Sequence, residues 1–406
     1  MKAYPHAIAQ LQKDFHEAAG GNVRNHVLDL VKRLIQGGMA MDIARLETLG
    51  VESRFGGIKR SCNHPPYFEH PSIIGAPWAD DPQNPLVAGE RWNEGDRATN
   101  TGIRYGFDAQ GYPRNPYMNT GLNGRGVLGK FGPNHAIDNG LMMFHKDEQG
   151  MTRLYTRVIL RKHDNNAPAF AGGFVKSSGG VGASTHEDIL QSRTEEFFEE
   201  MVSGSIDLLP YYREQIEKRY TEETGSRKSR GGVISSEHAQ EIREQIETQL
   251  KMEQVRDIDP EFMARLRQIV GQGHECYAGP VLNSNRVTNQ AWIETRLSWV
   301  LLDEPIWDYI RGDNPPFDYQ FKAGDDASDV RMIKLDSIFL KQSFESHSAM
   351  FAFMAASLLL EKEGHGESVP ESVMAQFEAM AVWLETFPVR NPVQKSMAAF
   401  DRPNFA

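Results

Sequence analysis

Carboxylates that could share a metal ion are concentrated in one short stretch, EDILQSRTEEFFEE, at residues 187–200. At about 100° of rotation per helical residue, Glu196, Glu199 and Glu200 lie at spacings i, i+3 and i+4 on one helix face. Carboxylates placed in this way can converge on a hard cation such as Mg²⁺, which prefers oxygen ligands. The alternative is a solvated acidic face, which is the commoner role of such a run.

The stretch also carries the signals of a helix over residues 185–202. Ser184 with Glu187 forms one capping box at its start. Thr185 with Asp188 forms a second, overlapping one. A separate stripe of the same helix should face a core. This stripe consists of Leu190, Thr194, Phe197 and Met201.

The stretch resembles the second half of the Nudix box, G-x5-E-x7-R-E-U-x-E-E-x-G-U with U apolar. Glu187 falls on the first Glu of the pattern. Glu196, Glu199 and Glu200 fall on its later glutamates. The preceding Gly172-Gly173 resembles the glycine pair that opens the box.

Two departures from the box affect how its first half is held. Thirteen residues separate Gly173 from Glu187 where the pattern has five, so the loop KSSGGVGAST carries an insertion. Glu195 stands where the family has an arginine that pairs with the first Glu. We therefore expect Glu187 to be loosely held, and to repel Glu195 unless a cation lies between them.

Segments on both sides of the box resemble, in the same order, the ADP-ribose pyrophosphatases of the mitochondrial-type Nudix subfamily. The C-terminal Nudix homology domain of the ADP-ribose-gated melastatin-type channel is similar. The matching segments are Trp78-Ala79-Asp80, Arg114-Asn115-Pro116, GRGVLGKFGPNHA (124–136), NQAWIET (289–295), AGDDA (323–327) and Ser346-His347-Ser348. Phe131 replaces a tryptophan of the family, and one extra residue follows Asn289.

The resemblance implies an α/β (α+β) fold: a Nudix α/β/α sandwich with an N-terminal α+β cap domain and added helices. It implies Mg²⁺-dependent hydrolysis of the diphosphate of ADP-ribose to AMP and ribose 5-phosphate, with Mn²⁺ as an alternative metal. The metal ligands would be Glu196, Glu199 and Glu200, which together with Glu187 are the candidate catalytic residues. The candidate substrate-binding residues are Arg114, Arg125, Phe131, Asn134, His135, Asn289, Trp292, Glu294, Asp325, Asp326 and His347. The general base stays open between Glu200, Glu187, Asp325 and Asp326.

The length of 406 residues exceeds that of one ordinary domain. We expect a helical extension, a cap domain that contributes to the cleft, a Nudix domain with a charged helical insert, and a helical tail. Their ranges are 1–60, 61–152, 153–360 with the insert at 211–270, and 361–406.

Local patterns give coarser expectations inside these ranges. Residues 6–50 show helical periodicity, whereas 51–150 are rich in Gly, Pro and Asn and predict loops with short strands. LYTRVILRK, HECYAGPVL, QAWIETRLSWVLL and DVRMIKL predict strands. In the insert, TGSRKSRGGVISS predicts an exposed loop, and GPNHA predicts a tight loop that presents Asn134 and His135 to substrate.

Composition limits the classes of binding partner and the location that we expect. The net charge of −11 and the pI near 5.7 argue against a nucleic-acid or membrane-surface binder. No run of eighteen apolar residues occurs, so we expect no membrane span. The two cysteines, Cys62 and Cys276, favour a reducing compartment. Since MKAYPHAIAQ lacks the apolar core of a signal peptide, we expect a cytoplasmic protein.

Three other functions stay open. The altered box is compatible with a module that binds ADP-ribose and hydrolyses it weakly. The enzyme could act on another ADP-linked diphosphate, such as NADH or an ADP-sugar. The insert at 211–270 could instead serve an interaction protein, by self-association or by binding a partner.

Overall fold

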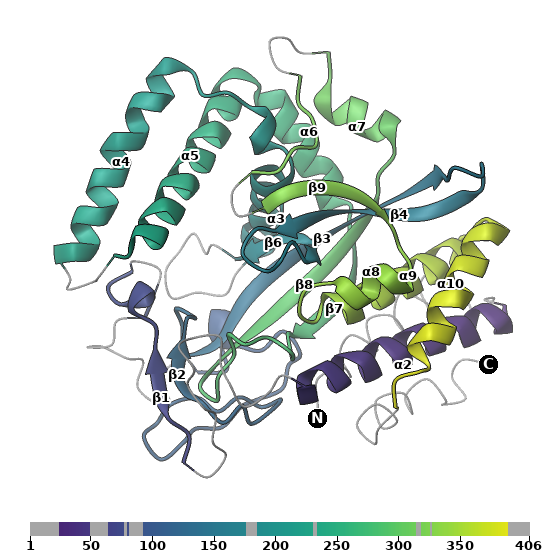
Figure 1. Cartoon of the computed structure of the whole chain (residues 1–406), viewed down its shortest axis with the longest axis horizontal. Helices are drawn as coiled ribbons and strands as arrows, with labels where there is room; N and C mark the ends of the chain where they lie inside the picture. Colours follow the sequence, from purple (N-terminus) through teal and green to yellow (C-terminus); the bar gives the residue numbers. More distant parts are fainter. Residues whose placement is uncertain are drawn as a thin grey trace.

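The computed structural model describes residues 24–48, 64–76, 79–80, 92–175, 185–229, 234–313, 318–324 and 327–388. Within these residues a mixed β-sheet lies between two layers of helices (Figure 1). The expected α/β/α sandwich is therefore confirmed.

The central sheet has seven strands. They are β3 (Gly132–Lys146), β4 (Thr152–Arg161), β5 (Pro168–Ala169), β6 (Ala171–Phe174), β7 (His274–Pro280), β8 (Ala291–Leu301) and β9 (Ala327–Lys334). The main order is β5-β4-β3-β8-β7, with β6 beside β3 and β9 beside β4. β3 and β8 pair in parallel, and the other pairs are antiparallel. The four segments predicted as strands correspond to β4, β7, β8 and β9.

β3 is the strand that the sequence did not predict. We expected only short strands within 51–150, but β3 is 15 residues long and lies at the centre of the sheet. A central strand is buried on both faces, so its sequence does not alternate between apolar and polar residues. Asp138, Asn139 and Gly140 interrupt the apolar run further.

Helices cover both faces of the sheet. On one face lie α3 (His186–Met201), α5 (Ser236–Ile258), α6 (Pro260–Gly271) and α7 (Glu304–Arg311). On the other lie α2 (Asn25–Thr48), α8 (Ser337–Gln342), α9 (His347–Gly364) and α10 (Glu371–Leu384). Each layer forms its own apolar core against the sheet.

α9 is the most deeply buried helix of its layer. Every residue from His347 to Leu360 is buried, as expected for a helix that is apolar on all sides. α2 covers the side of α9 that faces away from the sheet. Gly38 permits this close approach, because a Cβ there would lie 2.9 Å from the Cβ of Ala352. Gly37 does the same for the contact of α2 with α10 (Glu371–Leu384), because a Cβ there would lie 2.4 Å from the Cβ of Leu384.

The segment before β3 forms a small separate layer. It contains the parallel pair β1 (Tyr67–Glu69) and β2 (Asn123–Gly126), with short 3₁₀ turns at Pro71–Ile73 and Gly95–Arg97. β3 lies inside the range 61–152 that we expected for the cap, but its hydrogen bonds place it in the central sheet. The expected domain boundaries stay predictions.

The charged insert is helical, as predicted. α4 (Pro210–Ser229) and α5 form an antiparallel hairpin that stands away from the sheet (Figure 1). The hairpin has its own small core, which includes Tyr212, Ile216, Ile242 and Leu250. The loop predicted at TGSRKSRGGVISS is wrong in its first half, because α4 continues through Ser229.

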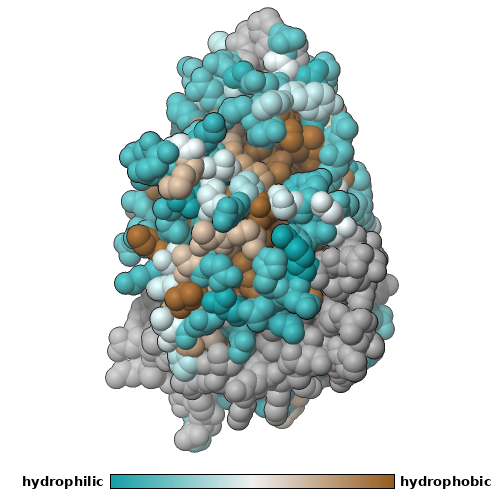
Figure 2. Space-filling model, turned by 90° about the vertical axis from the view of Figure 1, so that its right-hand side faces the viewer, coloured by the Kyte–Doolittle hydropathy of each residue, from teal (hydrophilic) through white to brown (hydrophobic). Residues whose placement is uncertain are grey.

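Figure 2 shows a face whose side chains are mostly hydrophilic, with apolar ones in small groups between them. Among the residues that the structure describes, four large apolar side chains are more than half exposed: Tyr67, Tyr211, Ile338 and Val382. They belong to β1, α4, α8 and α10, so they do not form one continuous stripe. In the parts of the chain that are described, no helix has the length and hydropathy to span a bilayer.

Candidate active site

Helix α3 begins at the predicted cap. The Thr185 hydroxyl accepts a hydrogen bond from the Asp188 backbone N–H, and the Asp188 carboxylate accepts one from the Thr185 N–H. The second predicted box cannot be assessed, because Ser184 lies outside the described residues. Three members of the predicted core stripe, Thr194, Phe197 and Met201, are buried.

The glutamates of the box are buried as well. Glu196, Glu199 and Glu200 are 8%, 7% and 2% exposed, so the solvated acidic face is excluded. Burial of a carboxylate is costly unless charge or hydrogen bonds compensate for it. Three carboxylates are therefore buried together within two turns of one helix.

The glycine pair of β6 separates these carboxylates from the neighbouring strand. The Gly172 N–H donates to Glu200 Oε2 at 2.7 Å. A Cβ on Gly173 would lie 2.3 Å from Glu196 Oε1, and one on Gly172 would lie 2.8 Å from Asp138 Oδ1. Because neither glycine has a side chain, the α3 carboxylates and Asp138 of β3 can approach the β6 backbone from its two sides.

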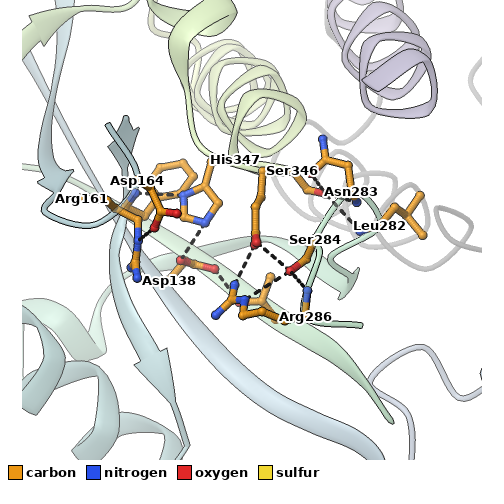
Figure 3. A network of polar contacts seen from close by, with 12 residues as sticks. Asp138, Arg161, Asp164, Leu282, Asn283, Ser284, Arg286, Ser346 and His347 are labelled. Atoms are coloured by element: carbon orange, nitrogen blue, oxygen red, sulfur yellow. Dashed lines mark hydrogen bonds and ion pairs between the residues drawn. The ribbon is translucent and has the colours of Figure 1, made fainter. Parts of the chain in front are cut away.

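Asp138 lines an open pocket on the α9 side of the sheet. Its cavity volume is about 50 Å³, which is smaller than the usual range of small-ligand sites, and it opens to solvent. It lies between β3, β6, β8 and the start of α9. Its polar side chains are Asp138, Arg161, Arg286, Thr295, Glu345 and His347, most of which Figure 3 shows.

The protonation of His347 follows from its hydrogen bond. The Phe170 N–H donates to His347 Nδ1 at 3.0 Å, so the proton of the neutral ring is on Nε2. Burial lowers the pKa of His347 to about 3, helped by Arg161 and Arg286. Nε2 lies 3.8 Å from Asp138 Oδ1, a contact between a neutral imidazole and a carboxyl group rather than an ion pair (Figure 3).

The second carboxyl oxygen of Asp138 also has a hydrogen-bond partner. The Thr295 hydroxyl donates to Oδ2 at 2.5 Å. Burial raises the pKa of Asp138 to about 6, although the Thr295 bond opposes that shift. The pocket therefore presents one donor, His347 Nε2, beside one carboxyl oxygen, Asp138 Oδ1, and 3.8 Å lets a single hydroxyl oxygen contact both.

Two arginines add positive charge at the pocket. Arg161 pairs with Asp164 at 3.0 Å, and Arg286 pairs with Glu345 at 2.7 Å. Both guanidinium groups lie over the ring of Phe344, at 4.9 and 5.9 Å from its centroid. Each arginine is thus held by a carboxylate and an aromatic ring, and both line the pocket that contains Asp138 and His347.

The insert supplies the positive charge that the box lacks. Arg256 of α5 pairs with Glu195 at 2.8 Å. Arg267 of α6 pairs with Glu187, whose side chain is 72% exposed. The expected repulsion between Glu187 and Glu195 is thus relieved by a separate arginine for each.

Glu294 joins the segment before β3 to the sheet. Its carboxylate accepts hydrogen bonds from Tyr117 OH at 2.9 Å and from Trp292 Nε1 at 2.8 Å. The Asn100 N–H donates to it as well. Glu294 is fully buried, and burial raises its pKa to about 7. Trp292 and Glu294 were predicted to bind substrate. The structure places them in a buried hydrogen-bond network that joins the segment before β3 to the sheet.

Three further predicted residues also contact neighbouring loops. Arg125 is fully buried and donates to Glu69, Asp80 O and Gly129 O. Its guanidinium lies 5.2 Å from the centroid of buried Phe131. The Asn289 side chain bonds Thr120 and Asn123. Arg114 is exposed.

The GPNHA segment is the start of β3, so the predicted tight loop is wrong. The Asn134 side chain bonds the backbone of Lys130 at 2.8 and 3.0 Å and so fixes the turn before the strand. Burial lowers the pKa of His135 to about 4. Its ring is neutral at neutral pH, and Nε2 donates to Ala98 O at 2.9 Å. Substrate contact by these two residues stays a prediction.

Some predicted residues lie outside the described ranges. They are Trp78, residues 176–184 of the inserted loop, Asp325 and Asp326. Within the ranges that are described, no group of three or more His, Cys, Asp or Glu side chains is already arranged to hold a metal ion. Glu196 and Glu200 approach β6 together, and the metal-ligand set stays a prediction.

The residues that sequence reasoning missed are Asp138, Arg161, Arg286, Thr295 and Glu345. They come from separate segments, and none belongs to the box. One signal was available: Asp138 interrupts the apolar run of β3, and a buried aspartate in a central strand needs a partner. The pairing of β3 with β8 beside Thr295 could not be read from local patterns.

Comparisons with known proteins agree with the motifs. Residues 59–132 match the family described as NUDT9-like, N-terminal domain. "Putative nudix hydrolase 6" of Caenorhabditis elegans is 33% identical over 148 residues, which cover 36% of this chain and 52% of that protein. "ADP-ribose pyrophosphatase, mitochondrial" of Rattus norvegicus is 40% identical over 82 residues, 19% of this chain and 23% of that protein.

A longer alignment involves an ion channel. "Transient receptor potential cation channel subfamily M member-like 2" of Nematostella vectensis is 28% identical over 226 residues, 54% of this chain and 10% of the channel. The chain thus spans about half or less of the length of each of these relatives. The resemblance to the Nudix ADP-ribose pyrophosphatases that the motifs indicated is confirmed.

Proposed function

We propose that this protein is a metal-dependent hydrolase that cleaves the diphosphate of ADP-ribose to AMP and ribose 5-phosphate. Support comes from the ordered motifs, from the NUDT9-like match at 59–132 and from relatives named as Nudix hydrolase and ADP-ribose pyrophosphatase. The observation that carries the proposal is that the glycine pair of β6 lies between two groups of acidic side chains. Buried α3 carboxylates lie on one side of Gly172-Gly173, and Asp138 and its pocket lie on the other.

The donor set suits a hard divalent cation. Glu196, Glu199 and Glu200 offer only carboxylate oxygens and are buried. These three residues would hold Mg²⁺ or Mn²⁺. When bound, the ion would neutralise charge on the diphosphate and lower the pKa of a coordinated water.

The pocket suits the sugar end of the substrate. A ribose hydroxyl can accept a hydrogen bond from His347 Nε2–H and donate one to Asp138 Oδ1. Arg161 and Arg286 line the same pocket and would bind the adjoining phosphate. Gly172 and Gly173 line the same pocket, so the bound diphosphate would lie within reach of the α3 carboxylates.

The test is turnover of a panel of ADP-linked diphosphates with Mg²⁺, with products identified by mass. The proposal expects ADP-ribose to be consumed fastest and to yield AMP and ribose 5-phosphate. Glu200→Gln should abolish this turnover. Glu195→Gln is the matched control, because it lies on the same helix and pairs instead with Arg256.

Two results would replace the proposal with an alternative. Faster turnover of NADH or an ADP-sugar would change the substrate. Saturable ADP-ribose binding without turnover would indicate a binding module.

A further inference from the structure

Helix α2 contacts a corner of the chain that carries several residues of the candidate pocket. Its residues 25–48 precede the NUDT9-like match at 59–132. It packs on α9 and α10, and its last turns reach the corner between α8 and α9. This corner comprises residues 343–348 and includes Phe344, Glu345 and His347, which line the pocket.

Arg45 binds the corner with an unusual number of hydrogen bonds. Its guanidinium donates to four backbone carbonyls at 2.7–3.2 Å and to the Ser348 hydroxyl. The carbonyls belong to Leu340, Lys341, Ser343 and Glu345. The last carbonyls of a helix lack partners within it, so Arg45 both caps α8 and ties the following residues together.

Asp42, one turn earlier on α2, binds the next residue of the corner. The Ser346 hydroxyl donates to Asp42 Oδ2 at 3.2 Å, and both residues are about 1% exposed. The same Ser346 oxygen accepts from the Leu282 N–H at 3.0 Å, just after β7. The network of Figure 3 shows Ser346 and Leu282 close to the pocket residues.

The corner needs to be held because its backbone is strained. Glu345 has a φ of +40°, in the left-handed region that residues other than glycine rarely adopt. This conformation directs the Glu345 carboxylate to Arg286 at 2.7 Å and to Ser284 at 2.6 Å. Strained residues of this kind persist only where surrounding contacts fix them.

We propose that Arg45 and Asp42 are positioning residues, through which α2 sets the placement of His347, Glu345 and Arg286 for substrate binding. The inference rests on the proposed function for the identity of the substrate. It assigns a role to a helix that lies outside the matched N-terminal domain and the Nudix box.

The chain provides a matched control on the same helix. Arg33 of α2 pairs with Glu378 at 2.6 Å and with Glu385 at 2.5 Å. These partners are on α10 and beside its end, and neither lines the pocket. Arg45→Met and Arg33→Met therefore each remove one arginine that joins α2 to the rest of the protein. Arg45→Lys is the milder variant, because one ammonium cannot reach all five acceptors.

The test has two arms, and the first needs no ligand. Hydrogen exchange is measured at the Phe170 amide, which donates to His347 Nδ1, and at the Leu282 amide, which donates to Ser346. Arg45→Met and Arg45→Lys should speed exchange at both amides relative to Arg33→Met, in native conditions where local opening dominates. Equal exchange in all three variants would overturn the proposal.

The second arm measures ADP-ribose kinetics. Arg45→Met should raise KM about tenfold while kcat stays within about threefold, because substrate placement rather than the α3 carboxylates is affected. Arg33→Met should leave KM unchanged, and an unchanged KM in both Arg45 variants would also overturn the proposal. If the wild-type protein consumes no ADP-ribose, the proposed function fails by itself, and the exchange arm still decides whether α2 orders the pocket.

Discussion

Replacing Asp138 with asparagine changes how stability depends on pH. The amide carbonyl introduced by Asp138→Asn can still accept the hydrogen bond that Thr295 donates, so the shape of the site is kept while its titration is removed. Burial raises the pKa of Asp138 from 3.8 to about 6. A shift of about two units corresponds to about 3 kcal/mol between the two protonation states.

The sign follows from the direction of the shift. A carboxyl group with a raised folded pKa favours the folded state fully below its unfolded pKa, 3.8, and this contribution is lost as pH rises through about 6. At pH 5 about 1.4 kcal/mol of it remains, and by pH 7.5 almost none does. His347 is neutral in the folded protein throughout this window, because its folded pKa is about 3, but it titrates in the unfolded state near pH 6.5. That contribution is common to the wild type and Asp138→Asn, so it cancels from the difference between them.

The assay is urea unfolding of both proteins at pH 5 and pH 7.5. The free energy of unfolding of the wild type, relative to that of Asp138→Asn, should fall by about 1.4 kcal/mol between the two pH values. An unchanged difference would show that Asp138 is already ionised at pH 5 in the folded protein. The assignment of a neutral carboxyl group beside His347 at that pH would then be wrong.

Three further predictions concern the α3 glutamates, Gly173 of β6 and the buried Glu294. Glu199→Gln and Glu200→Gln should each lose most hydrolytic activity with unchanged circular dichroism, because an amide removes the charge that a hard cation requires; normal turnover in both would contradict the metal assignment. Gly173→Ala should lower kcat about tenfold or more with little change in Tm, because its Cβ displaces only the far end of the Glu196 side chain, and a large loss of Tm would refute this. Glu294→Gln should cost about 1–3 kcal/mol in urea unfolding, because an amide cannot accept all three hydrogen bonds made to the carboxylate, and unchanged stability would argue against the buried hydrogen-bond network.

The acidic helix could be predicted from sequence because its determinants are local. The cap at Thr185, the apolar stripe and the clustered glutamates all lie within one helix, and the structure reproduces them. The sequence predicted that Glu187 is loosely held, but it could not identify the residue that pairs with it. Its partner, Arg267, is 80 residues away, and no local pattern links the two.

The pocket residues show more clearly what the sequence alone could not predict. Asp138 meets Thr295 across 157 residues, because β3 and β8 pair in parallel, and such pairing leaves no short-range signal. Trp292 and Glu294 were recognised by their motif, but a motif does not tell whether a side chain contacts a ligand or a neighbouring loop. Burial in three dimensions decides that, and here it directs both side chains into the protein.

The packing of α2 on α9 has a consequence for how the chain is made. Arg45 meets Ser348 across 303 residues, and α2 also packs on α10, which comes later still. At about 5–20 residues per second, translation takes about 15–60 s to span that distance, longer than most small domains need to fold. During that interval the apolar face of α2, including Val27, Leu30, Val31 and Leu34, has no partner to cover it. The nascent chain is therefore a natural client for chaperones that hold exposed apolar segments, and the α8–α9 corner is completed only after α9 has been synthesised.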